Sequence, residues 1–113
     1  MRTSFKMEEQ YITMVRGDTL SFGLFIDGLD GQDLETAFFT CKSKKTDSGN
    51  VFQKSLDDGI SKYNDGQYIV RVAPEDTEDI EAGKYFYDLQ ISVNDDVFTV
   101  MHGVLEITQD VTH

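Results

Sequence analysis

The sequence contains no tryptophan, one proline, one cysteine and two histidines. A single cysteine cannot form an internal disulfide, so the fold must rest on its apolar core, and a reducing cytosol suits such a chain. Apolar residues occur in short runs, none of which approaches the roughly 20 residues of a membrane-spanning helix. Residues 1–10 carry charges at Lys6, Glu8 and Glu9 and no apolar signal segment. We therefore expect neither secretion nor membrane insertion.

Basic residues are scarce as well. The chain has 10 Lys and Arg against 21 Asp and Glu, which gives a formal net charge of -11. Such a chain repels phosphate backbones and anionic lipid headgroups, so nucleic acid and membranes are not expected as partners. We interpret the acidity as a contribution to solubility, with a basic partner surface or bound cations as the alternatives.

The residue patterns of catalytic centres are missing too. His102 and His113 are the only histidines, and neither can be matched to a positioned carboxylate and nucleophile. The sequence has no phosphate-binding glycine loop, nucleophile elbow or zinc spacing. Cys41 lies in an alternating run without a neighbour that would activate its thiol, so we expect a core residue. We predict a protein without enzymatic activity and without a cofactor.

What the sequence does contain is alternation of apolar and polar residues, in runs separated by Gly, Asp and Asn. In the run 19–26, the side chains of Leu20, Phe22, Leu24 and Ile26 point to one face, as in a half-buried strand. Further runs bring the total to about seven strands. They cover residues 11–15, 36–42, 51–56, 67–72, 85–93 and 97–108.

We therefore predict an all-β fold, an antiparallel β-sandwich of about seven strands, in a single domain over residues 1–113. Residues 1–10 could form a flexible or partner-binding arm. Pro74 removes a strand hydrogen bond and suits the first helical position, so at most one short helical turn is expected near 74–80. The acids behind it complement that turn, with metal binding as the alternative. Gly103 interrupts the last run and predicts a bulge.

The tripeptide Arg16, Gly17, Asp18 is known as an integrin-binding signal when it is displayed at the tip of an exposed loop. Here it directly precedes the run 19–26. Gly and Asp favour tight reversals, so we expect a turn between two strands, with an adhesive role as the alternative.

The segment before the run 85–93 has a geometric meaning. Glu81 and Gly83 precede Tyr85, and this order resembles the corner that opens strand F in immunoglobulin-like domains, where the Tyr hydroxyl bonds back to the backbone of the turn. Tyr87 stands where such domains carry their second Cys, so this domain would lack the inter-sheet disulfide. The resemblance specifies the sandwich as immunoglobulin-like. The alternative is that Tyr85 is an ordinary core residue of another sandwich.

Four phenylalanines fall on the face opposite to the predicted core residues of their strands. A monomer does not normally expose several large aromatic side chains. Either a loop or a different register covers them, or they form a surface that binds another subunit. These candidate interface residues are Phe25, Phe38, Phe86 and Phe98.

The chain as a whole is similar to small immunoglobulin-like structural proteins encoded among the head, neck and tail genes of tailed phages and prophages of Gram-positive bacteria. Similar domains form N-terminal modules of baseplate proteins. The resemblance implies a virion component, made in the host cytoplasm, that contacts other virion proteins and copies of itself in a symmetric assembly, and it carries over no catalytic residues. The stretches that carry it, in order, are 16–19, 58–60, 66–77, 83–91 and 103–112.

A ligand-binding or adhesion module is the alternative function. The supply of Tyr and Phe would suit carbohydrate binding, and the acidic loops could assist by holding calcium. The residues do not distinguish a head, neck, tail or baseplate position.

Overall fold

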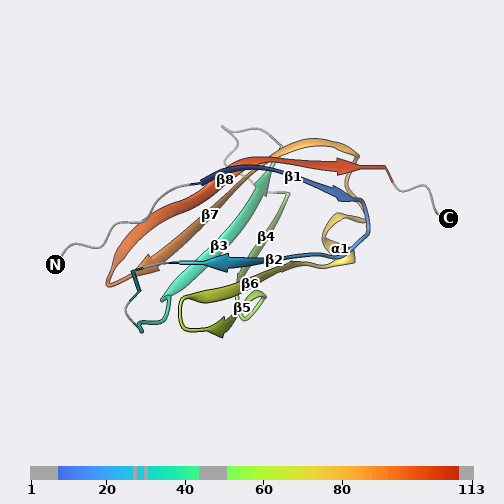
Figure 1. The fold of residues 1–113 in the computed structure, drawn as a ribbon. Helices are drawn as coiled ribbons and strands as arrows, with labels where there is room; N and C mark the ends of the chain where they lie inside the picture. Colours follow the sequence, from blue (N-terminus) through green and yellow to red (C-terminus); the bar gives the residue numbers. More distant parts are fainter. Residues whose placement is uncertain (1–7, 27, 30, 44–50, 110–113) are drawn as a thin grey trace.

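The structure is a computed structural model that describes residues 8–26, 28–29, 31–43 and 51–109. Within these residues the chain forms eight strands and one short helix, so the predicted all-β fold is confirmed (Figure 1). The helix α1 (Pro74–Thr77) is the short helical turn expected at Pro74. The strands are β1 (Glu8–Val15), β2 (Leu20–Phe25), β3 (Thr36–Lys42), β4 (Phe52–Leu56), β5 (Gly59–Asn64), β6 (Gln67–Val72), β7 (Gly83–Val93) and β8 (Asp96–Thr108).

The strands form one continuous mixed sheet in the order β1-β8-β7-β3-β4-β5-β6-β2. Only two residue pairs join β4 to β5, namely Ser55 with Gly59 and Leu56 with Ile60, and the sheet folds over at this point. The layer β1-β8-β7-β3-β4 then faces the layer β5-β6-β2 (Figure 1). The result is a sandwich-like fold whose two edge strands, β1 and β2, follow each other in the sequence.

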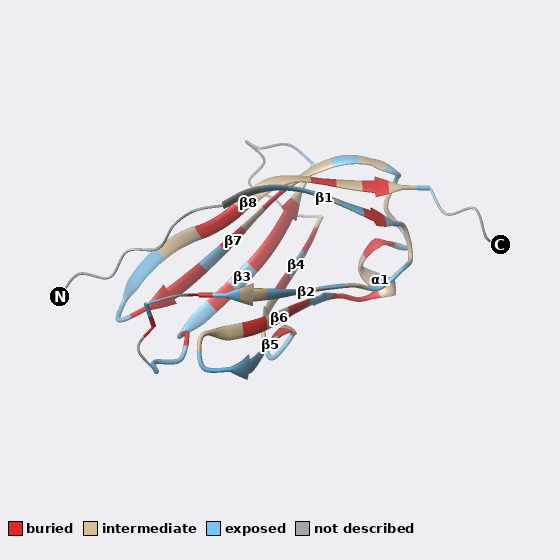
Figure 2. Cartoon of the chain, in the orientation of Figure 1, coloured by how far each residue is buried: buried red, intermediate tan, exposed pale blue. Residues whose placement is uncertain are grey.

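The core between the layers is built around Phe39 of β3, which is fully buried. Its ring centroid lies 5.4 Å from that of Tyr87 and 6.2 Å from that of Phe52, on the two strands beside β3. The ring of Phe22, on β2 in the opposite layer, lies 5.7 Å away. Cys41 is also fully buried on β3, as predicted. Figure 2 shows buried residues concentrated along β3 and β7, in the middle of the larger layer.

Two details of the sheet differ from the sequence expectation. The pairs β1–β8 and β4–β5 are parallel, whereas alternation had suggested a purely antiparallel sandwich. Alternation tells which face a side chain takes but not which strand lies beside it. The eighth strand is β5, in which Ile60 is buried and the residues 61–64 are exposed, so its sequence shows no alternating pattern.

The predicted bulge in β8 lies at Val100 rather than at Gly103. Leu89 pairs with Met101 and the next residue of β7 pairs with Thr99, so Val100 is the extra residue. The shift turns Phe98 to the core face, where it packs against the buried cluster. The prediction that Phe98 belongs to an exposed interface was therefore wrong. The bulge that sets its register lies at a valine, and no glycine marks it in the sequence.

Other local expectations can be compared directly. A two-residue turn of Asn94 and Asp95, both with positive φ, joins β7 to β8 in a long hairpin. Of the predicted arm, residues 8–10 belong to β1, and residues 1–7 lie outside the described part of the chain. No helix in the described ranges is long and apolar enough to cross a membrane.

Gly103 does not form a bulge but allows β1 to pack closely against β8. It pairs with Gln10 of β1 on one side and with Tyr87 of β7 on the other. The Tyr87 hydroxyl donates a hydrogen bond of 2.7 Å to the Gln10 carbonyl across β8. A Cβ atom at position 103 would lie 2.1 Å from that carbonyl oxygen, so β1 reaches its place only because residue 103 has no side chain.

Replacing Gly103 by alanine should therefore displace β1. We expect Gly103→Ala to lower the free energy of unfolding by about 1–3 kcal/mol, since overpacking forces the backbone to move. Urea denaturation followed by circular dichroism measures the loss. Gly23→Ala is the matched control, because a Cβ atom there meets nothing within 4 Å. Equal stability of the two variants would contradict this account of β1.

The buried thiol of Cys41 should be unreactive in the native protein. Burial raises its pKa to about 12. Against an unfolded thiol pKa of about 8.5, this lowers the thiolate population at neutral pH on the order of a thousandfold. We expect a thiol reagent to label Cys41 rapidly in denaturant and very slowly without it. Fast labelling of the folded chain would show that the site opens.

The same shift predicts alkaline instability. The folded state favours the neutral thiol, so its contribution is fully present below the unfolded pKa and is lost as the pH rises from about 8.5 towards 12. Chemical denaturation across this window should show stability falling with pH. The variant Cys41→Ala should show a smaller fall.

Candidate functional site

The corner before β7 has the geometry of a tyrosine corner. The Tyr85 hydroxyl donates a hydrogen bond of 2.6 Å to the backbone carbonyl of Glu81, four residues upstream. Gly83 lies between them with a φ of +155°, a backbone conformation that side chains disfavour. Burial raises the pKa of the Tyr85 hydroxyl, with smaller contributions from Cys41 and Glu81. These contacts fix the beginning of the longest hairpin.

The Arg16–Asp18 turn is held against α1 and against Ile80, which precedes this corner. The Gly17 N–H donates a hydrogen bond of 2.8 Å to Oγ1 of Thr77, which is fully buried in α1. The Arg16 guanidinium donates to the Ile80 carbonyl at 3.4 Å. The Asp18 N–H bonds back to the carbonyl of Val15 at 3.1 Å and closes the expected turn. The tripeptide is therefore held against the domain, which disfavours the adhesive alternative.

A buried ion pair, which the sequence analysis did not find, joins the larger layer to α1. Nζ of Lys54, on the core side of β4, lies 3.0 Å from Oδ2 of Asp76. The same carboxylate oxygen accepts a hydrogen bond of 2.7 Å from the Ala73 N–H. The side chains of Lys54 and Asp76 are only 11% and 16% exposed. The sequence contained one indication of this ion pair, because Lys54 lies on the same side of its strand as the apolar Phe52.

The four candidate interface phenylalanines do not form one surface. Phe38 and Phe86 lie on the outer face of the larger layer, where Phe38 is 37% exposed and Phe86 is half-buried. Phe25 lies on the outer face of the smaller layer and is 68% exposed. Phe98 is half-buried and packs against the core from the inner face of β8. The alternation of apolar and polar residues was sufficient to predict that Phe25, Phe38 and Phe86 point outward. It could not show to which layer each of them belongs.

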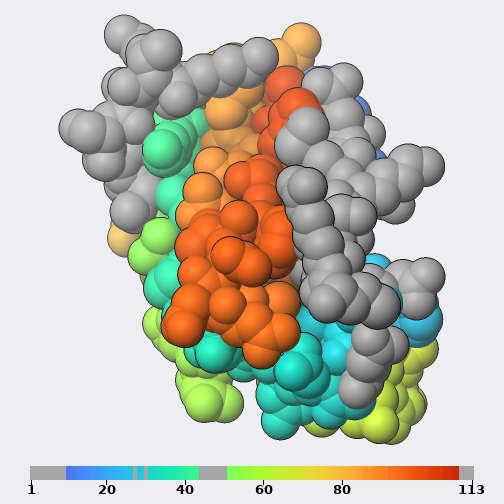
Figure 3. Space-filling model, turned by 90° about the vertical axis from the view of Figure 1, so that its left-hand side faces the viewer, coloured from blue at the N-terminus to red at the C-terminus, as the bar shows by residue number. Residues whose placement is uncertain are grey.

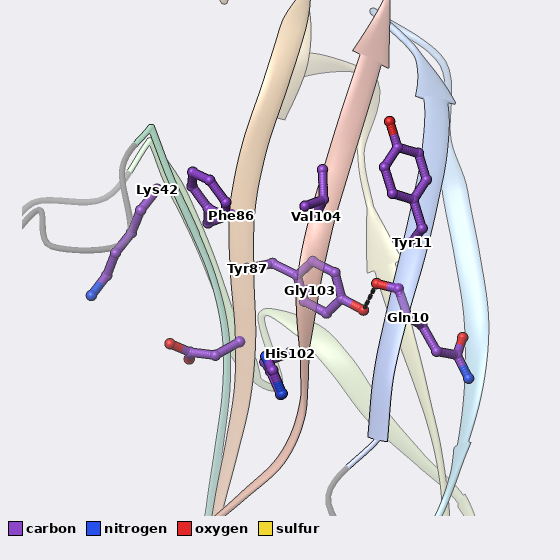
Figure 4. A pocket seen from close by; sticks show the side chains of 9 residues that line it. Gln10, Tyr11, Lys42, Phe86, Tyr87, His102, Gly103 and Val104 are labelled. Carbon is purple, nitrogen blue, oxygen red and sulfur yellow. Dashed lines mark hydrogen bonds between the residues drawn. The ribbon is translucent and has the colours of Figure 1, made fainter.

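A groove of about 590 Å³ crosses the outer face of the larger layer. We call it the sheet-face groove, and it runs over β3, β7, β8 and β1 (Figure 4). Phe86 and Val104 are cross-strand partners, and Tyr11 of β1 is the next residue in the same row. The Tyr11 hydroxyl donates a hydrogen bond of 2.6 Å to Glu106, which holds the ring and raises the pKa of that hydroxyl. These three side chains give the groove an apolar strip.

Polar groups line the sheet-face groove next to this strip. Asp88 and His102 are cross-strand partners one pleat away from Phe86 and Val104. Lys42, at the end of β3, pairs with Phe86 from the other side. The groove therefore combines aromatic surface with groups of both charge signs.

A second apolar surface surrounds β2, and we call it the β2 edge (Leu20–Phe25). A groove of about 460 Å³ lies along it. Its rim includes Phe25 and Tyr63, which is 67% exposed, and Ile69 of β6. The core-facing side chains of β2 are only half-buried, because β2 has a sheet neighbour on one side alone.

The β7–β8 turn (orange) and the residues before β3 (cyan) lie next to each other at one end of the molecule (Figure 3), and several carboxylates form contacts there. Lys62 forms ion pairs with Asp33 and Asp65. These two acids, Asp33 first, raise the pKa of the Lys62 ammonium. Glu35 accepts a hydrogen bond of 3.0 Å from the Asp95 N–H. The described residues contain no group of three or more His, Cys, Asp or Glu side chains suited to a metal ion.

Comparison with known proteins adds no identification, because neither a family model nor a curated protein matches this sequence. The surfaces themselves must therefore support any functional proposal.

Removing the corner hydroxyl should weaken the fold without altering its surfaces. We expect Tyr85→Phe to lower the free energy of unfolding by about 0.5–1.5 kcal/mol, since it leaves the Glu81 carbonyl without its intramolecular donor. The matched control is Tyr63→Phe, at an exposed tyrosine on β5. Urea denaturation compares the two variants. A loss no larger than that of the control would show that the corner contributes nothing to stability.

Proposed function

We propose that this chain is a non-enzymatic structural or assembly protein of a tailed-phage particle. The observation that carries the proposal is the exposure of large aromatic side chains on the outer faces of both layers, with Phe25 and Phe38 as the clearest examples. Exposed aromatic surface of this kind marks sites that other proteins cover. The partners would be other virion proteins and copies of this chain.

The sheet-face groove has the composition of a protein-binding surface. Phe86, Tyr11 and Val104 form an apolar strip that a partner side chain can cover, and aromatic residues are enriched at such contacts. Lys42, Asp88 and His102 border it with charged or polar groups that can orient a partner. β7 and β8 beneath it are each paired with a strand on both sides, so little backbone ordering would be needed on association.

Two sequence properties support the virion assignment. The ordered resemblance to immunoglobulin-like phage proteins covers most of the chain. The net charge of -11 disfavours nucleic acid as the partner, which leaves proteins as the favoured class.

Peptide mapping and cryo-electron microscopy of purified particles test the proposal. We expect the chain in complete virions, at a stoichiometry that matches a symmetric ring or decoration. Phe86→Ser should reduce the number of copies per particle, because it removes the aromatic ring at one end of the apolar strip. Gln90→Ala, at an exposed position of the same strand, should leave the copy number unchanged. Absence of the wild-type chain from complete virions would refute the proposal.

The sheet-face groove also supports a second candidate, a carbohydrate-binding module. Aromatic rings beside polar side chains are suited to stacking and hydrogen bonding with sugars. Glycan arrays with and without a chelator test this function. Binding to no glycan, together with a melting temperature that calcium does not change, would remove it.

A further inference from the structure

We propose that the β2 edge pairs with the β2 edge of a second copy around a two-fold axis at Gly23. The two smaller layers would join into one six-stranded antiparallel sheet. This inference deepens the proposed function by naming the surface through which copies of the chain meet.

The β2 edge lacks the usual protection of an exposed strand. β2 ends the strand order and pairs only with β6 among the described strands. Natural edge strands carry Lys, Pro or inward-pointing charges that prevent pairing with another chain. The six residues Leu20–Phe25 include no charged residue and no proline.

One hydrogen bond shows which backbone N–H and C=O groups of β2 point away from β6. The Ile26 N–H donates to the Gly66 carbonyl at 2.7 Å, so residue 26 turns its backbone groups towards β6. These groups alternate in direction along a strand. Ser21, Gly23 and Phe25 therefore direct their N–H and C=O groups away from β6, ready to bond an added strand.

The side chains are complementary in the same register. When Gly23 of one copy lies opposite Gly23 of the other, Phe25 lies opposite the second copy's Ser21, and Phe22 lies opposite its Leu24. Each pair then shares a face, as antiparallel neighbours must. The space above Gly23 is open, since an added Cβ would meet no atom within 4 Å. The exposed ring of Phe25 can fill this space in the partner.

Arg71 on the neighbouring strand also suits the aromatic side chain of a second copy. Arg71 is exposed and pairs with Ser21 on the outer face. In the two-fold register it would lie in the same row as the second copy's Phe25, within reach of a cation–π contact. The pairing is isologous, so it closes at a dimer instead of extending into a fibre.

Analytical ultracentrifugation over a concentration series tests the dimer with the full chain. We expect the wild type to reach twice the mass of a single chain. Gly23→Lys places like charges opposite each other and should weaken association about tenfold or more, as 1.4 kcal/mol or more of repulsion would. Gln53→Lys, on the outer face of β4, adds the same charge and should leave association unchanged. Circular dichroism verifies that each variant is folded.

Disulfide trapping tests the register itself. Hydrogen-bonded antiparallel partners have Cα atoms about 5.5 Å apart, which is within disulfide range. Gly23→Cys should therefore oxidise to a covalent dimer, whereas Gln53→Cys should stay single. The native Cys41 is fully buried and should not interfere.

Three results would overturn the inference. A wild-type chain that keeps the mass of one chain at every concentration would mean that something other than a second copy covers the β2 edge. Equal weakening by the two lysine variants would place the contact elsewhere. Cross-linking of Gly23→Cys no faster than that of Gln53→Cys would exclude the register. Each of these leaves the particle experiment above free to succeed or fail on its own.

Discussion

The contact between Phe39 and Phe22 across the two layers is the interaction on which the rest of the structure depends. No disulfide and no tryptophan join the layers, so aromatic packing must do so. Tyr87 extends this cluster to Gly103 and Gln10, which brings β1 against β8. This cluster lies between the layers and does not include Phe25 and Phe38, which are exposed on the outer faces.

The alternation of apolar and polar residues in the sequence was sufficient to predict the features that depend on a single strand, such as which side chains are buried. It predicted the buried side of β3, the outward direction of Phe25 and the core position of Cys41. The tyrosine corner could be found because its three residues are close together in the chain. The predictions that were wrong depend on how neighbouring strands pair. The bulge at Val100 turned Phe98 inward, and no residue near it signals such a bulge.

The two apolar surfaces differ in the kind of contact they can make. The sheet-face groove offers side chains over a strip whose backbone is already paired, so a partner there must be recognised by shape and charge. One side of the β2 edge pairs with no other strand in the described part of the chain, so the partner proposed there is an extended strand. Under the two proposals, a copy of the chain would bind at one surface and a different protein at the other.

The parallel pairing of β1 with β8 has a mechanical consequence. Eight residue pairs, from Glu8 with Met101 to Val15 with Thr108, join the first strand to the last. The strands are parallel, so the beginning of β1 and the end of β8 lie at opposite ends of the ladder (Figure 1). Tension applied between these two points would load all the hydrogen bonds of the pair in shear at once, instead of opening them one by one. The β1–β8 pair therefore resists extension along the direction of its strands.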